Sequence, residues 1–148
     1  APHLAAAAAG TAIDIDQLVT AYRRVATRAE AVVVEGVGGW LVPIGVTTTM
    51  ADFVQRLDLP VILVVGLKLG AINHALLTSE SIRNRGCRLE GWVANHPVGS
   101  APDGYVGAIA ERLTAPCLGV IPPNTTAEAA VKYLAAGLER VIAGKPES

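Results

Sequence analysis

Apolar and polar positions form two kinds of pattern along the chain. Apolar residues that recur about every three to four positions predict helices at 14–29, 49–57, 72–85, 106–113 and 126–143. Short continuous runs rich in Val and Ile predict buried strands at 31–35, 60–66, 89–95 and 118–121. Because these strands alternate with helices, the pattern predicts an α/β fold with a mainly parallel sheet and helices on both faces. No composition shift marks a boundary, so we expect residues 1–148 to form a single domain.

Each predicted strand is followed by a short segment of glycine, proline or polar residues. Ligands of open parallel sheets bind at the carboxyl ends of the strands. We therefore expect these segments to converge on one edge of the sheet, with Glu35, Lys68 and Asn95 on it. The segments are residues 35–39, 66–70, 95–97 and 121–123.

Composition and charge exclude several classes of partner. With 12 Lys and Arg against 13 Asp and Glu, the formal net charge is -1, which gives no attraction to nucleic acid or to an anionic membrane. The apolar run at 59–69 is too short to span a bilayer. Cys87 and Cys117 form no CxxC motif and are expected to be free thiols. We therefore expect a soluble protein of the reducing cytoplasm.

Glu35 stands between a buried valine run and a glycine-rich turn. A carboxylate at the mouth of a buried strand needs a cation or donors to offset its desolvation. Magnesium is one such partner, since Mg2+ is commonly held by one or two carboxylates together with phosphate oxygens. A turn-capping Glu paired with an Arg explains the same pattern, and the sequence leaves both interpretations open.

Two further strand ends carry groups suited to ligands. Gly70 feeds directly into a predicted helix, whose free N–H groups and dipole favour an anion, and Lys68 adds positive charge. Ordinary capping by Asn73 is the alternative. The side-chain amide of Asn95 both donates and accepts, so it can read the edge of a purine, although a turn-forming Asn before Pro97 is the commoner role for such a residue taken alone.

Several ordered segments resemble one family, the dethiobiotin synthetases. Residues 32–40 are similar to the family's Val-Glu-Gly-Ala-Gly-Gly segment. Residues 60–74 are similar to its Pro-Val-Ile-Leu-Val-Val-Gly-x-Lys-Leu-Gly-x-Ile-Asn-His segment. Residues 91–95 and 119–122, and the pair Pro2 and His3, match in the same order. The resemblance therefore extends over nearly the whole chain.

This resemblance implies a homodimeric enzyme of biotin biosynthesis with a fold like that of P-loop NTPases. Such a ligase closes the ureido ring of dethiobiotin from 7,8-diaminononanoate, CO2 and ATP, with Mg2+ as its metal. Two alternatives stay open. One is another P-loop relative, such as an enzyme of the cobyrinate amidase type or a partitioning ATPase. The other is a dimerising, ligand-binding protein without turnover.

The resemblance also implies a role for individual residues. Glu35 would be the catalytic carboxylate and a ligand of Mg2+, and Gly38 would contact the substrate. Asn95 would read adenine, with the backbone of Ile121 and Pro122 beside the base. The substrate carboxylate would be held by a helix start contributed by the partner subunit, with help from Tyr105. The residues of that helix start are Gly70, Ala71, Ile72 and Asn73.

One element of the family is not found in this sequence. No GxxxxGK[ST] motif occurs, and the family places that phosphate-binding loop before the point where this chain starts. Phosphoryl transfer depends mainly on positioning the phosphates and stabilising their charge. We therefore expect this chain to correspond to the C-terminal part of such an enzyme, and to be inactive alone.

Overall fold

The computed structural model describes residues 1–97 and 103–142. The chain divides into two compact units, Ala1–Leu59 and Pro60–Ser148. The last residue of the helix predicted at 126–143 lies outside the described residues. The single-domain organisation stays a prediction.

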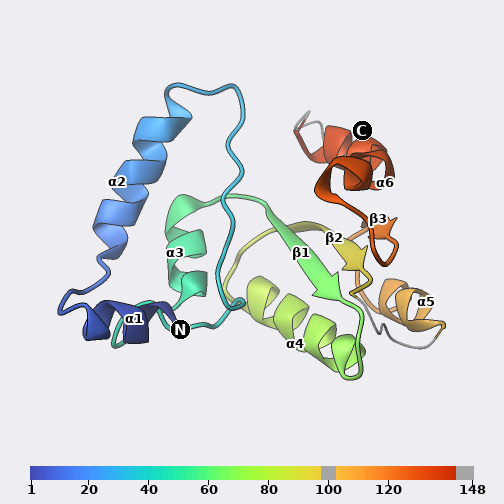
Figure 1. Cartoon of the computed structure of the whole chain (residues 1–148), viewed down its shortest axis with the longest axis horizontal. Helices are drawn as coiled ribbons and strands as arrows, with labels where there is room; N and C mark the ends of the chain where they lie inside the picture. The colour runs from blue at the N-terminus through green and yellow to red at the C-terminus, as the bar shows by residue number, and fades with distance from the viewer. Residues whose placement is uncertain (98–102, 143–148) are drawn as a thin grey trace. The chain divides into compact units, whose positions relative to one another are not determined.

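The second unit is built on a three-stranded parallel sheet. Its strands are β1 (Val61–Gly66), β2 (Leu89–Asn95) and β3 (Cys117–Ile121), in the spatial order β1-β2-β3 (Figure 1). All three lie within about a residue of the predicted runs, because continuous Val- and Ile-rich stretches suit a sheet that is covered by helices. The predicted parallel α/β architecture is confirmed.

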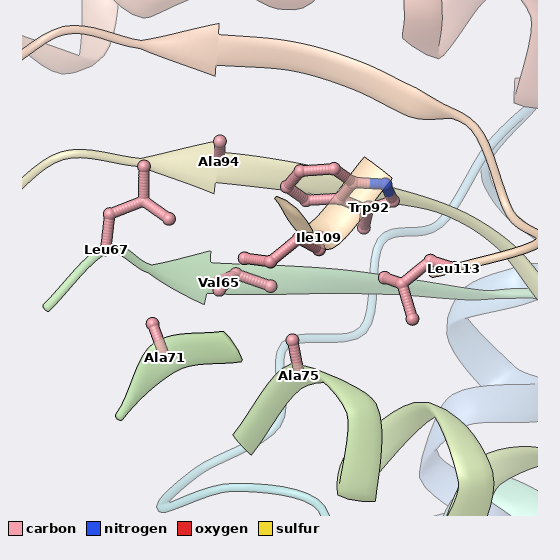
Figure 2. Close-up of a cluster of buried hydrophobic side chains, with 8 residues drawn as sticks. All are labelled: Val65, Leu67, Ala71, Ala75, Trp92, Ala94, Ile109 and Leu113. Atoms are coloured by element: carbon pink, nitrogen blue, oxygen red, sulfur yellow. The ribbon is translucent and has the colours of Figure 1, made fainter. Parts of the chain in front are cut away.

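One face of this sheet is covered by α4 (Ala71–Asn84) and α5 (Tyr105–Ala110). Side chains from both helices meet those of β1 and β2 in one apolar cluster (Figure 2). Trp92 is fully buried there together with Ala94, because alternate residues of a strand point to the same face, and Ile109 of α5 is fully buried in the same cluster. The members of the cluster are Val65, Leu67, Ala71, Ala75, Trp92, Ala94, Ile109 and Leu113.

The other face is partly covered by α6 (Ala127–Ile142), which packs against β3 (Figure 1). Helix and strand touch through their backbones. A Cβ on Gly119 would collide with the carbonyl oxygen of Tyr133, and one on Gly137 with the carbonyl oxygen of Leu118. Two glycines therefore permit this close approach. The expected placement of helices on both faces is confirmed.

The first unit contains three helices, α1 (Pro2–Ala8), α2 (Ile15–Ala26) and α3 (Met50–Leu57). A small core joins α2, α3 and the segment between them; it consists of Ile15, Val19, Ile44 and Phe53. Helix α1 was not predicted, although Pro at its first turn and a run of alanines both favour a helix.

The helix starts of this unit differ in their capping. The spacing of Asp14 and Gln17 is that of a capping box. Asp14 accepts a hydrogen bond from the amide of Asp16, but Gln17 takes no part, so the box does not form. A complete box forms instead at α3. The side chain of Thr49 accepts from the amide of Asp52, and the Asp52 carboxylate accepts from the amide of Thr49.

The predicted strand at 31–35 does not form, and this prediction is wrong. Residues 31–36 have no regular secondary structure, and Val33 is 90% exposed. Within the described residues, no backbone group bonds to the amides or carbonyls of 31–35. A strand is stabilised by its hydrogen-bonded neighbour and by cross-strand packing, so a β-branched run without a neighbour stays irregular.

None of the helices in the described ranges combines the length and the apolar character needed to cross a membrane.

Candidate functional site

The carboxyl ends of the three strands lie side by side at one edge of the sheet. Gly66 is in register with Asn95, and Asn95 with Ile121. The ladder continues one residue further, since the amide of Leu67 donates to the carbonyl of Asn95 (2.8 Å) and that of His96 to the carbonyl of Ile121 (3.0 Å). The structure thus brings the predicted residues Asn95 and Ile121 together, and Pro122 follows directly.

The helix start after β1 presents free backbone donors at this edge. Gly70 is the N-cap of α4 with a φ of 89°, a conformation that suits glycine. The amide of Ala71 donates to the Lys68 carbonyl, and the amide of His74 makes the bond to Gly70 that closes the first helical turn. Among the described residues, the amides of Ile72 and Asn73 have no backbone acceptor. They are therefore available to an anion.

The side chain of Asn73 is exposed and makes no hydrogen bond to any described residue. The capping role that is the alternative to ligand binding is therefore not observed. Lys68 is also exposed, and among the described residues it has no ion-pair partner. A cation and a side-chain amide therefore flank the two free amides of α4.

Tyr105 is the first residue of α5 and follows Gly104, whose φ is 91°. Tyr105 and Ile72 are both half-buried against the cluster shown in Figure 2. The start of α5 and the first turn of α4 therefore share one face of the sheet. This placement is compatible with the predicted assisting role of Tyr105, which stays a prediction.

The turn that follows β3 is closed by a side chain. The hydroxyl of Thr125 donates to the carbonyl of Pro122 (2.7 Å), and Asn124 adopts a positive φ of 59°. The next residue, Thr126, accepts from the amide of Ala129 at the start of α6. The pKa of Glu128 lies below its ordinary value because its carboxylate is hydrogen-bonded to its own backbone amide and to Thr126. Sequence reasoning missed Thr125, although a Thr three residues after a Pro carbonyl is a recognisable turn signal.

The glycine-rich turn of residues 36–39 lies in the other unit. Gly38 has a φ of 74°, and a Cβ there would stand 2.9 Å from Cγ2 of Val42. Gly39, with a φ of 106°, accepts a hydrogen bond from the amide of Val42 (3.2 Å). The tight turn therefore requires both glycines, and any side chain at position 38 would be strained.

Local hydrogen bonds connect this turn to the start of α3. The amide of Met50 donates to the carbonyl of Val42 (2.9 Å), and Pro43 and Thr49 form an antiparallel bridge. His3 of α1 approaches the same segment, with Nδ1 3.0 Å from the carbonyl oxygen of Pro43. The turn is thus anchored to α1 and α3 within its own unit.

Glu35, at the head of this turn, is exposed. Within the described ranges it forms no ion pair and no hydrogen bond, so the pairing with an Arg that could explain it is not observed there. No three His, Cys, Asp or Glu residues gather around a common point in that part of the chain. A single open carboxylate fits the way in which Mg2+ is held, by one or two carboxylates with phosphate oxygens and water.

The predicted site residues are thus divided between the two units. Glu35 and Gly38 belong to the first unit, and all the others belong to the second. Their predicted meeting at one edge stays a prediction for Glu35 and Gly38.

Comparison with known proteins gives a consistent result. The family model described as an AAA domain matches residues 1–131. An ATP-dependent dethiobiotin synthetase of Janthinobacterium sp. (strain Marseille) is 51% identical over 124 residues, which are 82% of this chain and 52% of that protein. The ATP-dependent dethiobiotin synthetase of Cellvibrio japonicus (strain Ueda107) is 46% identical over 131 residues, which are 87% of this chain and 58% of that protein. A third, from Xanthomonas oryzae pv. oryzae (strain PXO99A), is 44% identical over 134 residues, 89% of this chain and 60% of that protein.

The chain therefore spans between half and three-fifths of the length of the curated relatives it matches. The predicted resemblance is confirmed. The parallel sheet, the polar residues at the carboxyl ends of its strands and these sequence matches support the same conclusion. The chain belongs to the AAA domain family and is similar, over most of its length, to ATP-dependent dethiobiotin synthetases.

Proposed function

We propose that the complete protein is an ATP- and Mg2+-dependent dethiobiotin synthetase. It would convert 7,8-diaminononanoate, CO2 and ATP into dethiobiotin, ADP and phosphate. The observation that carries this proposal is the strand-end edge. There β2 and β3 end at Asn95 and Ile121, and α4, which follows β1, begins with the free amides of Ile72 and Asn73. The names of the relatives supply ATP and dethiobiotin, and the sequence resemblance implies the other reactants.

The proposed reaction has three steps. One amine of the substrate attacks CO2 and loses a proton to give a carbamate. The carbamate oxygen attacks the γ-phosphorus of ATP, which forms a mixed carbamic-phosphoric anhydride and releases ADP. The second amine then attacks the carbamate carbon, phosphate leaves, and the ureido ring is closed. Mg2+, when bound, neutralises phosphate charge, and Glu35 is the residue of this chain suited to hold it.

The substrate carboxylate would bind at the start of α4. Two unpaired amides at the positive end of a 14-residue helix, the side chain of Asn73 and the ammonium of Lys68 together supply the donors and charge that a carboxylate needs. Gly70 and Ala71 provide the turn that exposes these amides. Tyr105, at the start of α5, would assist.

The protein would act as a homodimer in which this helix start serves the partner's active site. Leu69, just before α4, is 88% exposed, and Leu77, one turn beyond Asn73, is 57% exposed. A partner subunit packed here would remove both apolar side chains from water, which would favour the dimer. The partners of the site would be small molecules rather than nucleic acid or a membrane, and the reaction would take place in the cytoplasm.

The nucleotide would bind at the ends of β2 and β3. The amide of Asn95 can pair with the edge of adenine, and the backbone at Ile121 and Pro122 would lie beside the base. Gly38 would contact the diamine through its backbone, since a side chain at this position would collide with Val42 and disturb the turn.

The proposal is tested on the complete protein by measuring phosphate release from ATP with and without 7,8-diaminononanoate and bicarbonate. Dethiobiotin formed in equal amount to phosphate would support it. Phosphate release that ignores the diamine would reject dethiobiotin synthesis and favour another P-loop ATPase. Binding of both ligands without any turnover would favour a non-catalytic, ligand-binding dimer.

A further inference from the structure

The turn after β3 presents an unusual set of backbone groups. Pro122 and Pro123 have no N–H, so this part of the turn offers only carbonyl acceptors. The carbonyl of Ile121 already accepts from the amide of His96, and that of Pro122 from the hydroxyl of Thr125. Among the described residues, the carbonyl of Pro123 accepts no backbone hydrogen bond. Pro123 lies two residues beyond the end of β3 and is exposed, so its carbonyl is open to a further hydrogen bond.

The stretch of Pro122 and Pro123, which offers acceptors and no backbone donors, can distinguish purines by their chemistry. A 6-aminopurine carries N–H donors at its 6-position, whereas a 6-oxopurine carries an acceptor there. Carbonyl groups can pair with the amino group, and they leave the oxo group unpaired. Leaving a buried polar group unpaired costs more than a hydrogen bond contributes, so even one such contact discriminates between the two bases.

The direction of the Pro123 carbonyl is set by two neighbours. The hydrogen bond from Thr125 to Pro122 is half-buried and closes the turn around Pro123. Asn124 takes a left-handed conformation, which Asn tolerates better than most residues, and this orients the peptide that contains the Pro123 carbonyl. The Thr125 hydroxyl therefore holds the orientation of the acceptor without itself facing the ligand.

We infer that Thr125 is a positioning residue that holds the Pro122 and Pro123 backbone in the shape that selects a 6-aminopurine nucleotide. This inference rests on the proposed nucleotide site at Asn95, Ile121 and Pro122. It adds to that site a side chain and a physical origin for base selection.

Thr126 offers a matched control within the same turn. Its hydroxyl oxygen accepts from the amide of Ala129 at 3.3 Å and so supports the start of α6, not the turn itself. A Thr to Val change removes one hydroxyl at nearly constant shape at either position. The two variants therefore separate the orientation of the turn from the stability of the helix that follows it.

The experiment is calorimetric titration of ATP, GTP and inorganic triphosphate into the complete protein and three variants. Thr125→Val should weaken ATP binding by about two- to tenfold, which is the effect expected for one lost hydrogen bond. The ratio of ATP to GTP affinity should fall by the same factor, while triphosphate binding, which involves no base, should not change. Thr125→Ser should keep the wild-type ratio because it keeps the donor. Thr126→Val should lower the unfolding temperature and leave the ratio unchanged.

Two results would overturn the inference alone. They are an unchanged ATP to GTP ratio in Thr125→Val when the wild type prefers ATP, and an equal loss of that preference in Thr126→Val. A wild type that binds ATP, GTP and triphosphate equally well would show that no base is read at this edge. That result would overturn both the inference and the proposed nucleotide site.

Discussion

Two apolar runs in this chain look alike in sequence and differ in structure. Residues 31–34 and the strand β1 are both rich in Val, and a glycine follows each of them closely. β1 pairs with β2 along its length, and Val65 is 5% exposed. The earlier run pairs with no described residue, and Val33 is 90% exposed. A β-branched run is thus only a candidate strand until a neighbour accepts its hydrogen bonds.

The two turns that follow these runs also differ in the hydrogen bonds that hold them. The turn after β1 begins on the ladder itself, because the amide of Leu67 bonds to the carbonyl of Asn95. The turn after Glu35 is held by local bonds between Val42 and Met50, and by the helix cap at Thr49. One half of the proposed site is therefore built on a sheet, and the other on short-range contacts.

Hydrogen exchange should show the largest contrast between the two runs. In this chain, the amides of 32–34 should exchange close to the rate of an unfolded peptide, whereas those of β2 should be slower by a factor on the order of a thousand. Mass spectrometry of the exchanging chain measures both at once. Equal protection of both segments in this chain would contradict the conclusion that residues 32–34 are unpaired.

Substitution of the glycines between β3 and α6 should strongly destabilise the second unit. Gly119→Ala and Gly137→Ala each place a methyl group against a backbone carbonyl that cannot rotate away, which should cost about 3 kcal/mol of unfolding free energy. Chemical denaturation of the complete protein measures this cost. Gly107→Ala is the control, since its methyl group would meet nothing within 4 Å and alanine favours the helix by about 0.5–1 kcal/mol. A tolerated Gly137→Ala would mean that α6 is not held by direct backbone contact.

Loss of the Asn73 side chain should weaken binding of the diamine at the start of α4 and leave binding of the nucleotide unchanged. A hydrogen bond to a charged group contributes roughly 1.5–3 kcal/mol, so Asn73→Ala should weaken diamine binding by about ten- to a hundredfold. ATP affinity should barely change. Calorimetric titration of both ligands into the complete protein separates these effects. Equal weakening of both would point to a folding defect, and unchanged diamine binding would return Asn73 to an ordinary surface position.

The smallest effect on stability is expected at the N-cap of α3, Thr49, which supports the turn after Glu35. Thr49→Ala removes the hydroxyl that accepts from the amide of Asp52, which should cost about 1 kcal/mol of stability. Thermal unfolding monitored by circular dichroism is the measurement. Thr47→Ala is the matched control because Thr47 is exposed and makes no hydrogen bond to the described residues. Similar unfolding temperatures for the two variants would show that the cap contributes nothing to the turn after Glu35.

Much of the second unit could be predicted from local pattern. The three strands and α4 lie within about a residue of their predicted bounds, because continuous apolar runs and helical periodicity each have one stable outcome there. The start of α4 at Gly70 could also be predicted from the sequence, since a glycine directly before a helical pattern is a local signal. These features depend on residues that are close together in the chain.

The sequence by itself thus determined the helices other than α1, the three strands of the sheet and the residues that follow them, together with a family resemblance that the comparisons confirm. Only the tertiary structure decided that residues 31–35 remain unpaired, that the capping box belongs to Thr49 rather than Asp14, and that Thr125 closes the turn beside Asn95. Composition and periodicity describe what a segment can become. Hydrogen bonds also require a partner in the right place, and the position of that partner is set by the fold of the rest of the chain.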